Sequence, residues 1–159
     1  MTSLFFLRHA TAEVIRPGQL DIDRCLIEKG RLQARKVANF MLKYNLTPQL
    51  VLSSPYPRAS QTAAIVSKVA RLPPAEEQDW LALETPTSQA LTALQQASVA
   101  WPQQVLLVGH EPDFSALISA LLGSQPPLLK IRKASLTCLQ LADDGSASLQ
   151  WSLPVRFMS

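Results

Sequence analysis

The chain has 159 residues, a length that suits one domain over residues 1–159 and allows a sizeable buried core. Hydrophobic residues make up 47% of the sequence and charged residues 17%, which is typical of a globular protein and excludes a disordered one. The net charge of +3 comes from scattered Lys and Arg without a basic run, so we expect no nucleic-acid partner. No apolar run approaches membrane length and no leader pattern opens the chain, so we expect a cytoplasmic protein without a membrane partner.

The first third of the chain predicts a buried strand followed by a long helix. Residues 3–7 form an uninterrupted apolar run, as expected of a strand inside a parallel sheet. A polar connection over 11–25 follows, and apolar residues then recur at helical spacing within 26–44. Because glycine is a poor helix former, Gly30 indicates that this helix begins just after it.

The middle of the chain continues with a second strand and two helices. Residues 50–52 predict a short buried strand. A helix is expected over about 57–70, with a proline in its first turn, where a helix needs no N–H donor. The two prolines at 73–74 end it, and a shorter helix is expected over 88–97.

The last third predicts a third buried strand, a helix and a hairpin. The strand covers 105–108, and the helix covers about 112–122, with a glycine after it as a natural C-cap. Two runs, 135–141 and 148–153, flank an Asp-Asp-Gly turn and predict an antiparallel hairpin. Strands that alternate with helices indicate an α/β fold, a three-layer α/β/α sandwich with a largely parallel central sheet.

Chemically active residues stand where the three predicted buried strands end. Arg8 and His9 follow the first strand, Arg58 opens the helix after the second, and His110 follows the third. His9 and His110 are the only histidines in the chain. Because ligands collect at the carboxyl ends of parallel strands, we expect these four residues to meet in one site.

This set of residues suits phosphoryl transfer. Arg8 and Arg58 carry planar guanidinium groups that bind phosphate oxygens in pairs. An unprotonated histidine can attack phosphorus, and the ordinary imidazole pKa of about 6.5 allows this near neutral pH. A cation in the first turn of a helix opposes the helix dipole, so the place of Arg58 also indicates a bound anion. The sequence therefore predicts a phosphate site with a histidine nucleophile.

Two other interpretations of the histidines are less favoured. A histidine at a strand end can serve only to bond the backbone, but two at equivalent places, one beside an arginine, indicate a shared site. A catalytic metal needs three or four ligands, and carboxylates stand near His110 but not near His9. Cys25 and Cys138 lack metal-ligand spacing and are too few for a disulfide framework, so we expect free thiols and no metal.

Three segments carry these residues in this order: Leu7-Arg8-His9-Ala10, residues 53–63, and Val108-Gly109-His110-Glu111-Pro112. Together they resemble the motifs of the histidine phosphatase superfamily, also called the phosphoglycerate mutase-like family, and the match spans nearly the whole chain. The small size of the chain and the segment 23–30 are most similar to the SixA-type phosphohistidine phosphatases. The resemblance implies the phosphoglycerate mutase-like form of the three-layer fold.

The resemblance also implies a role for each residue. His9 matches the nucleophile that becomes phosphorylated on a ring nitrogen, and Arg8 and Arg58 match the arginines that hold the phosphoryl oxygens. His110 matches the second histidine of the phosphate pocket, which donates to an oxygen of the transferring group. Water then hydrolyses the phosphohistidine, and no metal or organic cofactor is implied. Ala10 stands where the family usually has glycine, so the loop after His9 must accommodate a Cβ.

The acid that protonates the leaving group is not defined by the resemblance. Glu111 follows the second histidine, where one branch of the superfamily places its acid, and Glu84 lies where the mutase-like branch places its own. Each can equally be a solvated surface carboxylate. A phosphorylated imidazole leaves more readily than an alkoxide, because solvent can protonate its free nitrogen. A site without an assured acid therefore favours cleavage of a P–N bond.

The segment between the second and third motifs bears on the substrate. Residues 72–104 hold about one short helix, which leaves little material for a lid, so we expect an open pocket. An open pocket admits phosphohistidine on a protein such as a phosphotransfer domain. Lys130, Arg132 and Lys133 could border the pocket and guide an acidic partner, or could form a solvated basic loop.

Three further functions remain as alternatives. The first is a phosphatase that acts by the same mechanism on small phosphate esters. A phosphomutase would need a more enclosed site than this chain predicts. A phosphate-binding protein that has lost catalysis is disfavoured, because Arg8, His9, Arg58 and His110 are all present.

Overall fold

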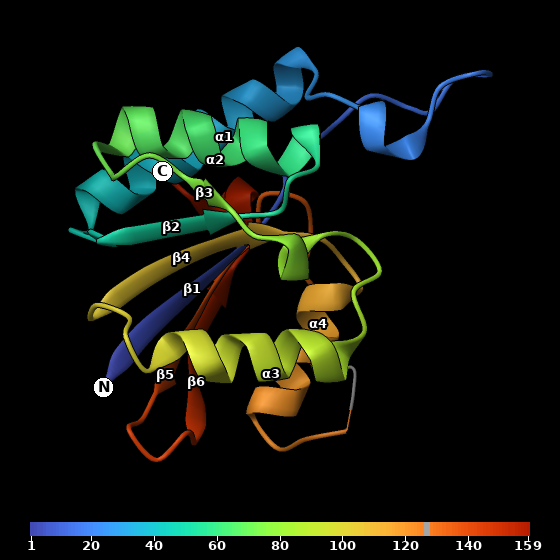
Figure 1. The fold of residues 1–159 in the computed structure, drawn as a ribbon. Coiled ribbons are helices and arrows are strands. Elements are labelled where there is room, and N and C mark those ends of the chain that lie inside the picture. Colours follow the sequence, from blue (N-terminus) through green and yellow to red (C-terminus); the bar gives the residue numbers. More distant parts are fainter. Residues whose placement is uncertain (126–127) are drawn as a thin grey trace.

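A six-stranded sheet forms the centre of the computed structural model, which describes residues 1–125 and 128–159 (Figure 1). In chain order the strands are β1 (Thr2–Arg8), β2 (Leu50–Ser53), β3 (Glu76–Glu77), β4 (Gln104–Gly109), β5 (Leu136–Leu141) and β6 (Ala147–Leu153). Their order across the sheet is β3-β2-β4-β1-β5-β6. The first four strands of that order run parallel, while β5 is antiparallel to both β1 and β6. The carboxyl ends of β1, β2 and β4 therefore lie at one edge of the sheet.

Two layers of helices cover the sheet, one on each face (Figure 1). One layer holds α1 (Glu28–Lys43) and α2 (Pro57–Ala70), and the other holds α3 (Thr87–Ser98) and α4 (Asp113–Leu121). Among the described residues there are also three short 3₁₀ turns: η1 (Asp21–Asp23), η2 (Asp79–Leu81) and η3 (Val155–Phe157). The observed fold is the three-layer α/β arrangement that the alternating pattern predicts.

The central strand β1 shows why the sheet needs helices on both faces. Its side chains alternate between two separate cores, because successive residues of a strand point to opposite faces. Phe5 and Leu7 pack with α1 and α2, whereas Leu4 and Phe6 pack with α3 and α4. All four are almost completely buried, which explains the unbroken apolar run in the sequence.

The predicted helices and strands are present, but the sequence did not predict one strand and misplaced the start of one helix. The edge strand β3 is missed because it has two residues, both exposed glutamates, and so carries no apolar pattern. The start of α1 is also wrong, since the helix begins at Glu28 and Gly30 lies inside its first turn. A Cβ on Gly30 would clash with the carbonyl oxygen of Thr11. Glycine therefore allows the loop after β1 to approach the helix closely, and it does not mark the helix start.

Cys25 and Cys138 are free thiols, as expected. Over residues 1–125 and 128–159, no helix combines the length and the apolar character that crossing a membrane requires.

Candidate active site

The sheet edge brings the two histidines together. His9 directly follows β1, and its backbone N–H donates to the carbonyl oxygen of Gly109 at the end of β4, 2.9 Å away. On the other side of β4, the N–H of Ser54 donates to the carbonyl oxygen of Val108, also at 2.9 Å. The ring centroids of His9 and His110 are 5.4 Å apart. Residues that are about 100 positions apart in sequence therefore lie side by side at one site.

His9 is buried, and the backbone orients its ring. Its Nδ1 lies 2.8 Å from the carbonyl oxygen of Ala10. Because a carbonyl oxygen only accepts hydrogen bonds, Nδ1 carries the proton and Nε2 keeps its lone pair. Burial, aided by the charges of Arg58 and Arg8, lowers the pKa of His9 from 6.5 to about 4. His9 therefore presents an unprotonated Nε2 at neutral pH.

The loop after His9 accommodates the Cβ of Ala10. This alanine is completely buried, and its N–H donates to Oγ1 of Thr62 at 3.1 Å. The Thr62 hydroxyl in turn donates to the carbonyl oxygen of Arg58 at 2.7 Å. Ala10 is not among the residues with positive φ, so an alanine adopts this backbone without strain. Alanine in place of glycine is thus compatible with the site.

His110 is held by a serine hydroxyl. Its Nε2 lies 2.7 Å from Oγ of Ser54, and that oxygen already accepts a hydrogen bond from the N–H of Tyr56 at 3.1 Å. Burial, together with His9 and Arg58, lowers the pKa of His110 from 6.5 to about 3, so the ring is neutral. When the Ser54 hydroxyl donates to Nε2, the ring proton of His110 lies on Nδ1.

The two arginines approach the site from different segments. Arg58 opens α2 and is 3% exposed. Its Nη1 donates to the carbonyl oxygen of Asp21 and its Nη2 to the carboxylate of the same residue, both at 3.0 Å. Nη1 of Arg8 donates to the carbonyl oxygen of Ile131 at 3.0 Å. Burial lowers the pKa of Arg8, and the carboxylate of Glu111 opposes this effect.

Several buried nitrogen atoms of these residues have no hydrogen-bond partner. Across the described part of the chain, four buried polar side-chain atoms are unpaired, and three belong to the site: Nε of Arg8, Nε of Arg58 and Nδ1 of His110. A buried donor left unpaired typically costs about 1–3 kcal/mol. An anion bound among these atoms would satisfy them. The site is therefore built to receive a group such as a phosphoryl.

Sequence reasoning missed some residues that complete the pocket. Asp21, in η1, accepts hydrogen bonds from Arg58 and from Nη1 of Arg24, the latter at 3.0 Å. Burial raises the pKa of Asp21, but these two hydrogen bonds outweigh burial and lower it. The charge of Arg24 also lowers the pKa of His9. Two of these residues lay in segments that the sequence had marked, Arg24 in the SixA-like segment 23–30 and Ser54 in the motif over 53–63, whereas Asp21 belonged to no such pattern.

The two candidate acids lie in different surroundings. Glu111 is half-buried, and its carboxylate accepts hydrogen bonds from the N–H of Ser115, at 2.7 Å, and from the Ser115 hydroxyl. Glu84 is exposed, and its backbone N–H donates to Asp113 at 2.9 Å. Among the described residues, neither glutamate is hydrogen-bonded to a site histidine. The identity of the acid stays a prediction.

A metal site needs several ligand side chains close together. Within the described ranges, no three His, Cys, Asp or Glu side chains gather into a group of that kind.

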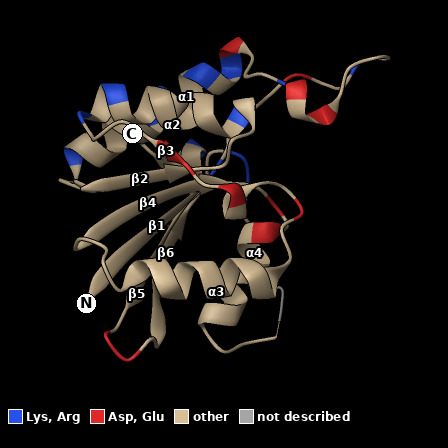
Figure 2. Ribbon diagram, viewed as in Figure 1, with Lys and Arg blue, Asp and Glu red and all other residues tan. Residues whose placement is uncertain are grey.

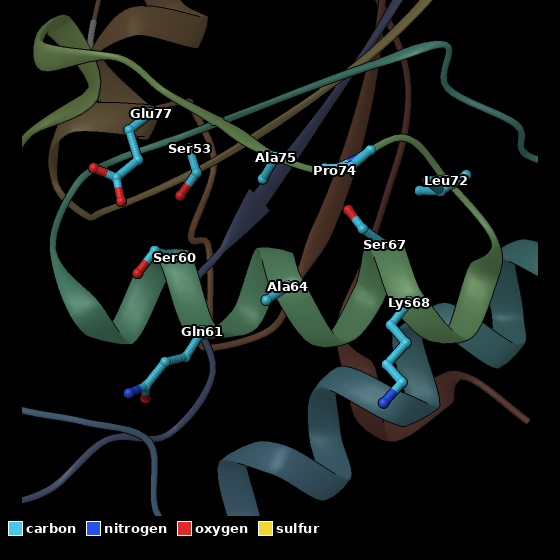
Figure 3. A pocket seen from close by; sticks show the side chains of 10 residues that line it. All are labelled: Ser53, Ser60, Gln61, Ala64, Ser67, Lys68, Leu72, Pro74, Ala75 and Glu77. Carbon is cyan, nitrogen blue, oxygen red and sulfur yellow. The ribbon is translucent and has the colours of Figure 1, made fainter.

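Two cavities adjoin this part of the molecule. One, of about 470 Å³, is lined by Arg8 together with Lys130, Arg132 and Lys133, so these three cations border the site. The other, of about 580 Å³, lies between α2 and the segment 72–77, as the side chains in Figure 3 show. Its lining includes Ser53 but none of the site histidines and arginines. We therefore place the phosphate chemistry outside this second cavity.

The sequence matches a known family. The profile described as the histidine phosphatase superfamily (branch 1) matches residues 4–91, more than half of the chain. The chain is 28% identical over 157 residues to the phosphohistidine phosphatase SixA of Escherichia coli K12, covering 94% of this chain and 92% of that protein.

The fold matches the solved structures of two phosphatases. The structure of the protein histidine phosphatase SixA complexed with tungstate has a TM-score of 0.90, with 23% identity, 99% of this chain covered and 100% of that one. A mycobacterial glucosyl-3-phosphoglycerate phosphatase has a TM-score of 0.76, with 22% identity and coverage of 94% and 97%.

The chain therefore belongs to the histidine phosphatase superfamily and is a phosphatase. Within the superfamily it is similar to SixA in sequence and in fold.

Proposed function

We propose that this protein is a metal-independent phosphohistidine phosphatase, which removes phosphate from histidine of a phosphorelay-type protein through a phosphorylated His9. One observation supports the proposal above the others. A neutral His9 with a free Nε2 lies near buried nitrogen atoms of Arg8, Arg58 and His110 that have no hydrogen-bond partner among the described residues. Preorganised donors around a nucleophile are what transfer of a phosphoryl group requires.

In the first step, Nε2 of His9 forms a bond to phosphorus while the P–N bond of the substrate breaks. The electron pair of the broken bond goes to the leaving imidazole, which solvent protonates. Arg8 and Arg58 hold the phosphoryl oxygens, and the Nδ1 proton of His110 is donated to one of them. The hydrogen bond from His9 Nδ1 to Ala10 keeps the nucleophile in the correct tautomer.

In the second step, water attacks the phosphorus of phosphorylated His9. The P–Nε2 bond breaks, its electron pair returns to Nε2, and inorganic phosphate leaves with the oxygen of the water. The arginines and His110 serve both steps, because the phosphoryl group carries the same negative oxygens in each. No step needs a metal ion, since two guanidinium groups offset the charge of the phosphoryl oxygens.

The surroundings of the carboxylates favour a nitrogen leaving group. Glu111 accepts two hydrogen bonds from Ser115 at the start of α4, and Glu84 is exposed. An alkyl ester depends on a general acid, which typically contributes about 10²–10⁴-fold, while a phosphorylated imidazole depends on it less. The SixA relative, which by name acts on phosphohistidine, supports the same choice.

A phosphatase of small phosphate esters is the alternative. It is favoured by the similar fold of the glucosyl-3-phosphoglycerate phosphatase, whose name describes a small phosphorylated substrate. The mechanism at His9 would be the same, and only the leaving group would differ.

The test is phosphate release from a histidine-phosphorylated phosphotransfer domain, from free phosphohistidine and from an alkyl phosphate ester. We expect rapid release from both phosphohistidine substrates, little from the ester, and no change on addition of a chelator. The variant His9→Ala should lose at least about 10⁴-fold on every substrate, as removal of a covalent nucleophile does. A substrate with a radioactive phosphoryl group should label the wild-type protein during turnover and should not label the variant.

Other outcomes would redirect the proposal. Strong ester turnover that His9→Ala abolishes would move the substrate to small phosphates and keep the mechanism. Equal activity of the wild type and the variant would reject His9 as the nucleophile, and loss of activity with the chelator would reject metal independence.

A further inference from the structure

One cavity beside the active site has an unusual charge. The cavity of about 470 Å³ next to Arg8 is lined by six of the 15 Lys and Arg of the chain and by no Asp or Glu. We call this cavity the basic groove, and its six cationic residues are Arg8, Lys29, Lys130, Arg132, Lys133 and Arg156. They come from the end of β1, the first turn of α1, the loop before β5 and η3. Although the net charge of the chain is only +3, positive charge is therefore concentrated at this surface.

The cations of the basic groove are not neutralised by salt bridges in the described part of the chain, although the carboxylate of Glu111 acts on Arg8 from outside the groove. Among the described residues, none of the six takes part in a salt bridge, although Arg24, Arg31 and Arg58 elsewhere each pair with a carboxylate. In Figure 2 acidic residues colour β3 and the start of α4. Like charges gathered without counter-charges repel one another, and an anionic partner would relieve this repulsion.

The basic groove is joined directly to the nucleophile. Arg8 belongs to both the groove and the phosphate pocket. The loop before β5 is fixed to the residues of the site, since the N–H of Ala134 lies 3.1 Å from the carbonyl oxygen of Arg8 and 3.2 Å from that of His9. A protein bound in the groove therefore has the adjacent part of its own surface next to His9.

We propose that the basic groove docks an acidic surface of the phosphohistidine protein and so presents the phosphorylated histidine to His9. This inference rests on the proposed function and names the kind of partner that the site selects. The five cations other than Arg8 are exposed side chains from three segments of the chain. Exposed, spread charges steer a large partner of opposite charge, whereas a small second anion needs a few buried donors at one point.

The test compares two triple variants with the same change of charge. The groove variant carries Lys130→Glu, Arg132→Glu and Lys133→Glu. The matched control also replaces two exposed lysines and one exposed arginine, all outside the basic groove: Arg35→Glu, Lys43→Glu and Lys68→Glu. Each protein is assayed for kcat/KM with a histidine-phosphorylated phosphotransfer domain of acidic surface and with free phosphohistidine, at low and at high salt.

We expect the groove variant to lose about tenfold or more in kcat/KM on the phosphorylated domain at about 20 mM salt, within the range of electrostatic steering. The loss should shrink at about 0.5 M salt, because the screening length falls to a few ångströms. Free phosphohistidine should be hydrolysed within about twofold of wild type by both variants, which also shows that both are folded.

Three results would overturn the inference. Equal loss in both triple variants would show that net charge alone acts. Equal loss on the domain and on free phosphohistidine would make the groove a subsite for small anions. Unchanged turnover of the domain by the groove variant would leave the groove without a role in docking. Failure of the proposed function is distinct, because the wild type would then release phosphate from neither phosphohistidine substrate.

Discussion

The phosphate pocket and the basic groove share Arg8, yet they handle charge in opposite ways. In the pocket, His9 is 5% exposed, His110 1% and Arg58 3%, and burial lowers the pKa of both histidines. In the groove, the remaining cations are exposed to solvent. Burial strengthens an electrostatic interaction at short range, while exposure lets a charge act on an approaching partner. The pocket is therefore suited to chemistry and the groove to recognition.

The largest expected difference between the phosphate pocket and the basic groove is in how much kcat/KM falls when one arginine of each is replaced by lysine. Arg58→Lys keeps the charge but removes the planar fork, so kcat/KM should fall about 10²–10³-fold on every phosphate substrate, as for loss of a preorganised donor. Arg132→Lys should change kcat/KM less than about twofold, because an exposed groove residue acts through its charge. Steady-state kinetics on free phosphohistidine and on the phosphorylated domain checks both. A large effect of Arg132→Lys would break the comparison.

The second difference concerns stability and pH. The pKa of His9 is about 4 and that of His110 about 3 in the folded protein, both below the ordinary value of 6.5. The unfolded chain therefore binds more protons below pH 6.5, and stability falls as the pH drops from 6.5 through the folded-state values. We expect a loss on the order of 2–3 kcal/mol for each histidine between pH 7.5 and 4.5.

Urea unfolding at the two pH values measures this loss. His9→Gln should remove about one histidine's share of this loss, whereas Arg132→Lys in the groove should keep the full pH dependence, since Lys and Arg do not titrate in this range. An unchanged pH dependence in His9→Gln would contradict the burial of a neutral histidine in the pocket.

The smallest expected effect on turnover comes from replacing Ser54, which positions the ring of His110. Ser54→Ala removes the hydroxyl at 2.7 Å from Nε2 of His110, so the ring can take the other tautomer. We expect kcat to fall about tenfold on both phosphohistidine substrates, with KM nearly unchanged, which is typical of lost transition-state interactions.

Nitrogen NMR of His110 should show the proton shifting from Nδ1 towards Nε2 in this variant. Ser60→Ala, whose hydroxyl contacts only the backbone of Pro57 among the described residues, is the matched control and should change neither kcat nor the tautomer. Wild-type kcat in Ser54→Ala would remove Ser54 from the site.

The amino-acid sequence by itself determined the architecture and the place of the site. Apolar runs and helical spacing predicted the buried strands and the helices, because periodicity reports which face an element buries. Arg8, His9, Arg58 and His110 could be grouped because the carboxyl ends of parallel strands share one edge. The two-residue strand β3 was not predicted, since both of its residues are exposed and give no apolar pattern in the sequence.

The tertiary structure decided what depends on contacts between segments far apart in the chain. The tautomer of His9 follows from its hydrogen bond to Ala10, the ring of His110 is held by Ser54, and Gly30 is required by its approach to Thr11. Asp21 meets Arg58 across 37 residues. The basic groove gathers cations from positions 8 to 156, which appear scattered along the sequence. Local patterns record which residues face inward, but distances between separate elements arise only when the whole sheet and its two helical layers are packed.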